Sequence, residues 1–489
     1  MALTTLTGLA GQYDWPALIA SAADTVYRAA IQTPLQPATR LSQALGVRVL
    51  LKREDLQPVF SFKLRGALNR LAQLTDADKQ RGVICSSAGN HAQGVAMAAQ
   101  LLGLRALVVM PATTPQIKVD AVKALGADIR LIGDSYDDAQ ADALVVAQRD
   151  GLHFVHPFDD PYVIAGQATI GSELLTQCAQ APTAVFIPVG GGGLAAGIAL
   201  AVRAKWPDTQ LIGVEHEHSA SMQAAFRAQA PVTLPRVGLF ADGVAVKRVG
   251  DLTYDIACNA LDALMRVTTD QICAATRDIY EDTRVVVEPA GAIAVAAARQ
   301  WSAQQKNLDS NAELIAINCG ANLNFDRLRH IAERAAIGEQ REALFAITIQ
   351  ESPGSFKQFL DALGPVSVTE FNYRLSDDAD ARLFVGVELR ADQPSRGQLS
   401  ERLRQGGYAC EDISDSELAK LHLRHLVAGG ASNVTHERLF RFEFPERPGA
   451  LKDFLDAMDT DWNITLFHYR NHGSDHGRVL VGIVVPQNH

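Results

Sequence analysis

The chain has 489 residues and a mass of 52.6 kDa, a length that suggests about three domains. Hydrophobic residues make up 47% of it and charged residues 20%, a composition that excludes a largely disordered chain. The 55 acidic and 45 basic residues give a net charge of −10, which argues against a protein that binds nucleic acid through its phosphates.

The chain shows no sign of export or of membrane insertion. The segment before Arg28, the first basic residue, lacks the positively charged region of a secretory signal, so we expect a cytoplasmic protein. The stretch Ala184–Val202 is long and uncharged, but Pro188 and four consecutive glycines interrupt it, so we expect no membrane span. No CxxC pair occurs, which predicts reduced thiols and no metal site. The six cysteines are Cys85, Cys178, Cys258, Cys273, Cys319 and Cys410.

The first part of the chain, about 330 residues, alternates strand-like and helix-like segments. Strands are expected at Val47–Lys52, Gly82–Ser86, Ala106–Met110, Asp128–Ile132, Ala184–Val189 and Gln210–Val214. Helices are expected at Leu64–Leu74, His91–Leu102, Ile117–Leu125 and Leu194–Ala204. This alternation predicts an α/β fold, in which parallel sheets carry helices on both faces. Ligands are then expected where strands end and helices begin.

The C-terminal part contains an internal repeat. The segment Leu344–Leu363 resembles Leu439–Met458, and Pro353 matches Pro448, 95 residues later. Each unit begins as strand, Pro-Gly turn, amphipathic helix, strand and strand. Two α+β units without a paired nucleophile and base indicate a binding module, and the alternative is a structural lobe for oligomerisation.

The two units differ in how they end. The first continues through a helix-like segment, Gln398–Gln405, and a strand-like segment, Ala409–Ile413. The second reaches His489 just after its third strand, so we expect it to lack counterparts of that helix and strand.

The first segment that suggests chemistry is Ser61–Ala67, in which Lys63 stands between Phe62 and Leu64 at the start of an apolar helix. Most lysines are solvated surface residues. Here the helix dipole and partial burial would both favour the neutral amine, which is the form that imine chemistry requires.

The second segment is Ser86–Gly94, between a strand and a helix. Its small residues would let backbone N–H groups approach a carboxylate, and the side chain of Asn90 both donates and accepts hydrogen bonds. A helix-capping turn made by Ser87 or Asn90 is the alternative. His91 invites a catalytic role, but we do not expect it to have one.

The third segment comprises Gly190, Gly191, Gly192, Gly193 and Leu194, again between a strand and a helix. Exposed amides at a helix N-terminus bind phosphate. The same segment fits the dinucleotide pattern G-x-G-x-x-A, with Glu215 as the ribose-binding acid. A reactive lysine, an Asn turn and a phosphate loop together describe a site for pyridoxal 5′-phosphate, whereas the dinucleotide interpretation explains only the third segment.

These motifs, in this order, resemble those of the biosynthetic threonine dehydratases (threonine ammonia-lyases), which are fold type II pyridoxal-phosphate enzymes. The segments that carry the resemblance are SFKLRGA (61–67), SSAGNHAQG (86–94), GGGGL (190–194), VEPAGA (287–292) and GANLNF (320–325). The C-terminal units resemble the ACT-like regulatory lobes of the same family. The resemblance implies a tryptophan synthase β-like catalytic region with two parallel-sheet subdomains, followed by ferredoxin-like regulatory repeats.

The resemblance also implies domain boundaries. The catalytic region would span residues 1–335, with a small subdomain at about 50–150 inserted in the large one. A linker would follow at 336–342, and the ACT-like repeats would span 343–415 and 436–489, the second incomplete at its C-terminal end.

By the same resemblance, Lys63 is the Schiff-base lysine, Phe62 lies beside the cofactor, and Asn90 contacts its ring hydroxyl. The loop from Gly190 to Leu194 would hold the phosphate. Cys319 would face the pyridine nitrogen, where the closest members usually carry Ser and related serine dehydratase-type enzymes carry Cys. The alternative for Cys319 is a buried thiol at a strand end. The residues expected to line the substrate side are Ser87, Ala88, Gly89, His91, Gly243 and Glu288.

The implied reaction is the elimination of water from L-threonine, with Lys63 removing the Cα proton, to give 2-oxobutanoate and ammonia in the first step of isoleucine biosynthesis. Isoleucine would inhibit and valine would oppose it, at a pocket formed by the Pro-Gly turns and the strands around Phe371 and Phe467. A homotetramer is also implied. The rivals are serine dehydration, racemisation or β-replacement on the same fold, a catalytically silent amino-acid sensor, and a dinucleotide-dependent oxidoreductase.

Overall fold

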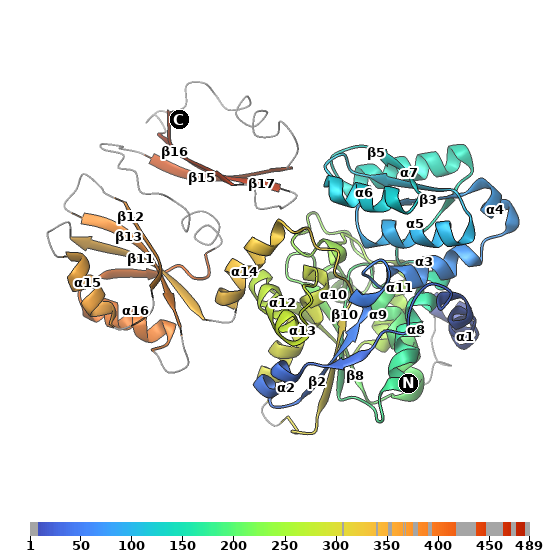
Figure 1. The fold of residues 1–489 in the computed structure, drawn as a ribbon, viewed down its shortest axis with the longest axis horizontal. Helices are drawn as coiled ribbons and strands as arrows, with labels where there is room; N and C mark the ends of the chain where they lie inside the picture. The colour runs from blue at the N-terminus through green and yellow to red at the C-terminus, as the bar shows by residue number, and fades with distance from the viewer. Residues whose placement is uncertain are drawn as a thin grey trace. The chain divides into compact units, whose positions relative to one another are not determined.

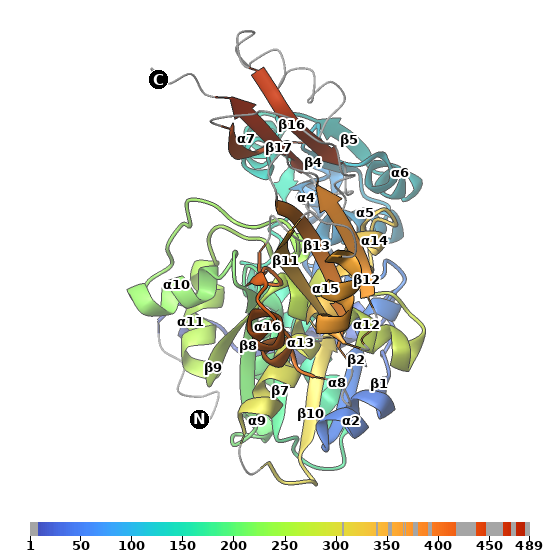
Figure 2. The same cartoon turned by 90° about the vertical axis from the view of Figure 1, so that its left-hand side faces the viewer.

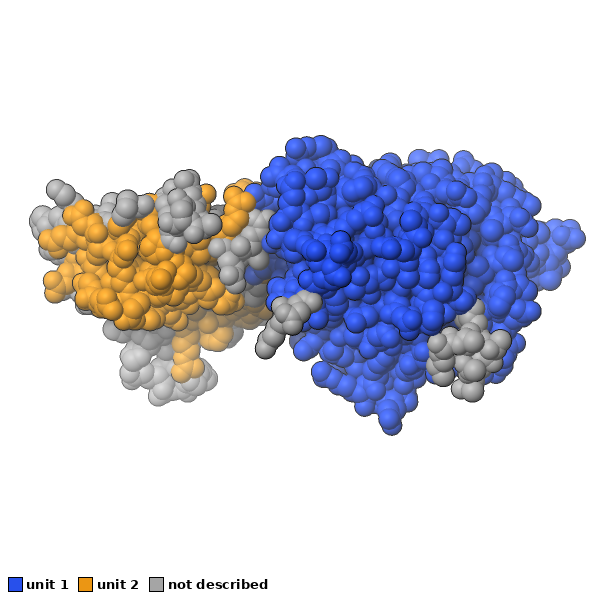
Figure 3. All heavy atoms as spheres, turned by 90° about the horizontal axis from the view of Figure 1, so that it is seen from below, with its two compact units in different colours: residues 1–325 blue, residues 326–489 orange. Residues whose placement is uncertain are grey.

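The computed structural model describes residues 8–305, 308–338, 341–350, 355–364, 366, 368–374, 380–389, 394–416, 437–445, 463–470 and 476–484. The chain divides into two compact units, Met1–Phe325 and Asp326–His489 (Figure 3). The second unit begins with helix α14 (Arg327–Gly338), which runs into the stretch 336–342 that we expected to be a linker. The catalytic region was expected to end at residue 335, whereas the first unit ends at Phe325.

The larger sheet of the first unit has the strand order β1-β2-β10-β7-β8-β9. Its strands are parallel except for β1, which pairs antiparallel with β2. Their bounds are β1 (Leu35–Pro37), β2 (Arg48–Arg53), β7 (Ala184–Pro188), β8 (Gln210–His216), β9 (Ala263–Val267) and β10 (Glu313–Asn318). The strands β7 and β10 are buried along their whole length, as expected for central strands covered on both faces.

A second, smaller sheet of parallel strands has the order β5-β4-β3-β6. Its strands are β3 (Val83–Ser86), β4 (Ala106–Met110), β5 (Asp128–Leu131) and β6 (His153–Phe154). Figure 1 shows this sheet with α5, α6 and α7 around it, separate from the larger sheet that contains β2, β8 and β10. The two parallel-sheet subdomains of the prediction are therefore confirmed.

Helices connect the strands and cover the sheets. They are α1 (Trp15–Val26), α2 (Thr39–Leu45), α3 (Lys63–Ala72), α4 (Asp76–Arg81), α5 (Asn90–Leu102), α6 (Gln116–Ala124), α7 (Tyr136–Asp150), α8 (Pro161–Gln177), α9 (Gly193–Lys205), α10 (Ser221–Ala228), α11 (Asp251–Ala260), α12 (Thr269–Thr283) and α13 (Pro289–Gln304). Short 3₁₀ turns lie at η2 (Ala10–Gln12), η3 (Glu54–Leu56) and η4 (Asp242–Val244). All ten segments predicted above for this unit have a counterpart, and β4 has the predicted ends, whereas the other nine differ at one end or both.

Each subdomain has a core of its own. The larger core joins the inner strands to α9 and α13 through residues such as Phe186, Ile198 and Ile293. The smaller core lies among α3, α5, β3 and β4, with Leu68 and Val95 fully buried. Because each core is continuous with the helices that follow its strands, the strand ends and helix starts are held in fixed positions.

After α14, the second unit contains an antiparallel sheet of order β12-β13-β11-β14. Its elements are β11 (Glu342–Gln350), α15 (Ser355–Leu363), β12 (Val368–Arg374), β13 (Asp380–Glu388), α16 (Arg396–Gln405) and β14 (Ala409–Asp412). Alternate residues of β11, Phe345 and Ile347 among them, form a core with Phe359 of α15 and Leu399 of α16. Both helices therefore cover one face of the sheet (Figure 2).

A second sheet of this unit has the order β15-β17-β16, with β15 (Glu437–Pro445), β16 (Asn463–Arg470) and β17 (His476–Val484). It matches β11, β12 and β13 strand for strand, as the internal repeat predicts. The Pro-Gly turns at Pro353 and Pro448 lie outside the described residues. Among the described helices, none is long and apolar enough to span a membrane. The described part of the chain also shows no group of three or more His, Cys, Asp or Glu side chains able to hold a metal.

Candidate active site

The ends of two central strands bring the predicted motifs together. Residues Leu314–Ala316 of β10 pair in parallel with Ala184–Phe186 of β7, so the carboxyl ends of both strands lie at one edge. Cys319 follows β10, and the four glycines follow β7. The segment that carries Lys63 reaches the same edge, because the backbone N–H of Phe62 donates to the carbonyl of Cys319 (3.3 Å). This edge is where parallel sheets bind ligands.

Lys63 is the first residue of α3 and is half-buried. Its Nζ donates to the carbonyl of Pro157 at 2.9 Å and lies 5.4 Å from the centre of the Phe62 ring. Burial lowers the pKa of Lys63 to about 8, and the nearby groups of Cys319 and Glu288 act in the opposite direction. At neutral pH more of this amine is therefore neutral than of an ordinary lysine, as imine formation requires.

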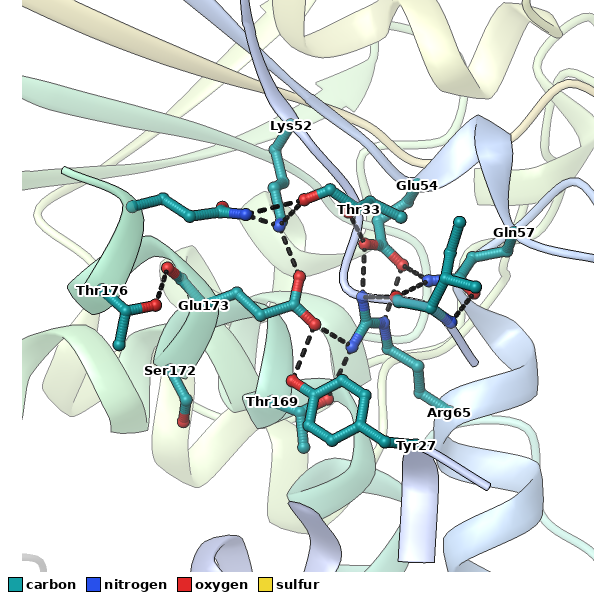
Figure 4. A network of polar contacts seen from close by, with 12 residues as sticks. Tyr27, Thr33, Lys52, Glu54, Gln57, Arg65, Thr169, Ser172, Glu173 and Thr176 are labelled. Carbon is teal, nitrogen blue, oxygen red and sulfur yellow. Dashed lines mark hydrogen bonds and ion pairs between the residues drawn. The ribbon is translucent and has the colours of Figure 1, made fainter. Parts of the chain in front are cut away.

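A buried network of charges holds α3 on the side away from Lys63. The guanidinium of Arg65 donates to Glu54 (2.8 Å and 2.7 Å) and also binds Glu173 on α8, which in turn binds Lys52 on β2 (Figure 4). All four charged side chains are at most 4% exposed. Burial alone would raise the pKa of Glu54, but Arg65 outweighs it and holds that pKa below the usual range. The network thus fixes the start of α3 relative to β2 and α8.

The glycine loop is closely packed and has no room for side chains. A Cβ at Gly191 would overlap the ring of Phe158, and Gly192 has a left-handed φ of +98°. The hydroxyl of Thr253 donates to the Gly191 carbonyl (2.6 Å) and holds the loop. The loop ends at Gly193, the first residue of α9, and the first N–H groups of a helix lack partners within it. Backbone amides at a helix start suit a phosphate.

Asn90 belongs to a cluster of three polar side chains. Its Nδ2 donates to Oε1 of Glu288 (2.6 Å), and its Oδ1 accepts from Nδ2 of Asn322 (2.7 Å). Asn322 also donates to the carbonyl of Val59 (2.8 Å), next to the Lys63 segment. Burial raises the pKa of Glu288 to about 7, and Asp242 adds to this effect. Asn90, which opens α5, and Glu288, which precedes α13, are thus brought into direct contact from distant parts of the sequence.

Cys319 is 3% exposed and its Sγ donates to the carbonyl of Ala290 at 3.2 Å. Burial raises the pKa of this thiol well above its ordinary value, and Glu288 acts in the same direction, against Lys63. Cys319 is therefore a neutral thiol at physiological pH.

The remaining predicted substrate-side residues have different surroundings. The residues Ser87, Ala88 and Gly89 are half-buried in the loop between β3 and α5, and the Gly89 N–H donates to the Ser87 hydroxyl (3.2 Å). His91 is 4% exposed, and its Nε2 lies 3.0 Å from the carbonyl of Val155. Burial lowers the pKa of His91 to about 3, with a further contribution from Lys63. The ring is therefore neutral and engaged with the backbone of the small subdomain.

The turn η4 places Gly243 against the same cluster. A Cβ at Gly243 would lie 2.9 Å from Cβ of Ala290 and 3.3 Å from Oε1 of Glu288. The neighbouring Asp242 forms an ion pair with Lys118 of α6 (Nζ–Oδ2 2.7 Å). Lys118 was not predicted to lie near the site, because one lysine on an amphipathic helix gives no signal of its own. No role was predicted for Asn322 either, although this residue lies within the GANLNF segment that carries the resemblance.

Comparisons with known proteins identify the family of the chain. Residues 26–320 match the family of pyridoxal-phosphate dependent enzymes. Residues 333–423 and 428–489 match the C-terminal regulatory domain of threonine dehydratase. A biosynthetic L-threonine dehydratase of Burkholderia multivorans is 51% identical over 465 residues, which are 94% of this chain and 91% of that protein.

Solved structures lead to the same family. The processed form of threonine deaminase isoform 2 from Solanum lycopersicum has 45% identity and a TM-score of 0.64, over 66% of this chain and 89% of that one. The T.th. threonine deaminase has 38% identity and a TM-score of 0.59, over 63% of this chain and 98% of that one. The chain belongs to the family of biosynthetic threonine dehydratases, pyridoxal-phosphate-dependent enzymes with a C-terminal regulatory domain.

Proposed function

We propose that the protein converts L-threonine to 2-oxobutanoate and ammonia by eliminating the β-hydroxyl group as water. The observation that carries the proposal is the half-buried amine of Lys63, with its lowered pKa, at the strand edge that also holds the glycine loop. The membership in the threonine dehydratase family supports this substrate over the serine, racemisation and β-replacement alternatives.

The residues at this edge fit pyridoxal phosphate. The loop from Gly190 to Gly193 carries backbone amides and no side chains, and together with the helix start at Gly193 it suits the phosphate. Asn90 and the neutral thiol of Cys319 supply hydrogen-bonding groups for the ring, and Lys63 supplies the amine for covalent attachment. When bound, the cofactor withdraws electrons from the substrate Cα and so stabilises the negative charge that develops there.

Each side chain then has a defined task. Lys63, whose ammonium is destabilised by burial, takes the proton from Cα. The loop Ser87–Gly89, with its backbone N–H groups, receives the substrate carboxylate. Glu288 accepts a hydrogen bond from Asn90 and so fixes the orientation of that amide. Cys319 stays neutral and adds no negative charge beside the ring nitrogen.

Substitution of Lys63 by Ala tests the catalytic assignment. We expect 2-oxobutanoate formation to fall by several powers of ten, about as for other covalent residues. The matched control is Lys123→Ala, an exposed lysine on α6, which should leave the rate unchanged. Borohydride reduction followed by peptide mass mapping should place the cofactor on Lys63 in the wild type. A Lys63→Ala protein that retains turnover would end the proposal, and a higher rate on serine or O-acetylserine than on threonine would favour the rival reactions.

We also propose that the second unit binds isoleucine as an inhibitor, with valine opposing it. The support is the match of residues 333–423 and 428–489 to the regulatory domain. Phe371 lies on β12 and Phe467 at the matching place on β16, since each pairs with a Val of the third strand. A titration of threonine turnover with isoleucine should show inhibition that valine relieves. Activity that is indifferent to isoleucine at every concentration would contradict the proposal.

A homotetramer and a cytoplasmic location complete the proposal. The homotetramer is an expectation from the family resemblance, and the cytoplasmic location is the expectation drawn above from the sequence before Arg28. Sedimentation of the purified protein should give a mass near four times 52.6 kDa, and fractionation of the source cells should recover it with the cytoplasm.

A further inference from the structure

An ion pair joins the small subdomain to the turn that borders the catalytic cluster. Lys118 lies on α6, beside the small sheet, and Asp242 opens η4 in the larger part of the unit. Their charged atoms are 2.7 Å apart, and the side chains are 16% and 28% exposed. Because both side chains are partly withdrawn from water, their interaction is screened less than that of a surface pair.

The turn η4 contacts the catalytic cluster as well as Lys118. Gly243 follows Asp242, and the position of its Cβ would be 3.3 Å from Oε1 of Glu288. The same Oε1 accepts the 2.6 Å hydrogen bond from Asn90. A shift of the turn therefore changes the surroundings of Glu288, and through it those of Asn90.

Charged groups around Glu288 come from several elements. Asp242 on η4 is negative and raises the pKa of Glu288, in addition to burial, whereas Lys118 on α6 lowers it. The amide of Asn90 on α5 and the backbone N–H of Asn322 also favour the ionised form. Lys63 and Cys319 face the same region and are themselves affected by Glu288. Lys118 is thus the charge that offsets Asp242.

We propose that Lys118 is a positioning residue for the catalytic site. Through its ion pair with Asp242 it holds η4 against Glu288 and compensates the negative charge that η4 brings beside that carboxyl group. The ionised carboxylate then accepts a charge-assisted hydrogen bond from Asn90, which fixes the amide. The inference deepens the proposed threonine elimination, because it names a residue on which the geometry of that site depends.

The chain offers a matched control. Lys247 forms an ion pair with Asp137 of α7 and so links the same loop region to the same small subdomain. These side chains are more exposed, at 39% and 54%, and Lys247 is not among the groups that shift Glu288. Lys247→Met therefore removes a link of the same kind without removing the compensating charge.

The experiment compares the pH dependence of kcat/KM for threonine in Lys118→Met and Lys247→Met. In Lys118→Met, the positive charge that lowers the pKa of Glu288 is lost. The acid limb of the pH profile should therefore move to higher pH by roughly half a unit to one unit. This corresponds to a loss of about three- to tenfold at pH 6. Lys118→Arg, which keeps the charge, should retain most of the wild-type profile. Lys247→Met should leave the limb in place.

Substitution of Asp242, the partner of Lys118, should shift the acid limb in the opposite direction. It also keeps the inference testable if the Lys118 variant does not fold. Asp242→Asn removes the negative neighbour, so its acid limb should move to lower pH. The inference would be overturned if the acid limb lay at the same pH in Lys118→Met as in the wild type. It would also be overturned if Lys118→Met and Lys247→Met shifted the acid limb by the same amount.

A second measurement separates this inference from the proposed function. Infrared spectra of the cofactor-free protein, recorded against pH, should show the carboxyl band of Glu288, identified by its absence in Glu288→Gln. This band should titrate at higher pH in Lys118→Met than in the wild type, whatever the enzyme does to threonine. A wild-type protein that is inactive on threonine would contradict only the proposed function. A carboxyl band of Glu288 that titrates at the same pH in Lys118→Met as in the wild type would contradict the inference.

Discussion

At the scale of single residues, the site depends on what burial does to charge. Burial lowers the pKa of the Lys63 amine and raises those of the Glu288 carboxyl and the Cys319 thiol. In each case burial favours the neutral form, because a charged group loses its hydration in the interior. A neutral amine can attack an aldehyde, and a neutral thiol brings no negative charge into the site. One physical effect thus prepares several groups of the site.

The lowered pKa of Lys63 predicts how fast the cofactor-free protein takes up pyridoxal phosphate. Only the neutral amine forms the covalent bond, and below about 8 its fraction rises roughly tenfold per pH unit. The rate of uptake, followed by stopped-flow absorbance, should therefore rise with pH and level off above about 8. An ordinary lysine would show a rise that continues toward pH 10, and such a profile would contradict the burial of this amine.

At the scale of elements, the motifs were predictable from the sequence because they lie where a strand passes into a helix. The positions of Lys63, Asn90 and the glycine loop at such junctions are confirmed by α3, α5 and α9. Contacts between distant segments were not predictable. The hydrogen bond from Asn90 to Glu288 spans 198 positions of the chain, and no local pattern encodes it.

Helices that are buried on nearly all sides were also hard to identify from sequence. In α13, residues from Pro289 to Ala298 are all buried, so the apolar residues show no period of 3.6. The helix α8 is similar, with buried residues in unbroken succession from Val163 to Gly171. Such helices take their stability from the surrounding core, which a single sequence does not reveal.

The charge network behind α3 predicts a large loss of stability when one partner is removed. In Glu173→Gln, Arg65 and Lys52 lose the carboxylate that they share in the interior, so unfolding should become easier by about 3–5 kcal/mol. Thermal melting of the holoenzyme measures this. The control is Asp150→Asn, which removes the exposed pair with Arg149 and should leave the melting temperature unchanged. A stable Glu173→Gln protein would show that the network does not hold α3.

At the scale of the whole molecule, catalysis and regulation belong to separate units of the chain. Unit Met1–Phe325 contains every residue assigned to the site. The T.th. threonine deaminase is matched over 98% of its own length by only 63% of this chain, so relatives of about catalytic-unit size exist. We therefore predict that the first unit folds without the second.

A chain that ends after Gly338 tests this division. It should still deaminate threonine, because the site and both cores of the first unit remain. It should lose the proposed response to isoleucine, because the regulatory domain is missing. Turnover measured with and without isoleucine, beside the full-length protein, gives the answer. Inhibition that persists in the shortened chain would place the effector in the first unit.

The buried thiol of Cys319 has a further consequence for the life of the protein in a cell. Peroxides and alkylating agents react with accessible thiolates, and this sulfur is both enclosed and protonated. Of the six cysteines, Cys258 is the exposed one and would meet such reagents first. The centre is therefore insulated from oxidative damage, and a fluorescent label could be attached at Cys258 while the enzyme keeps working.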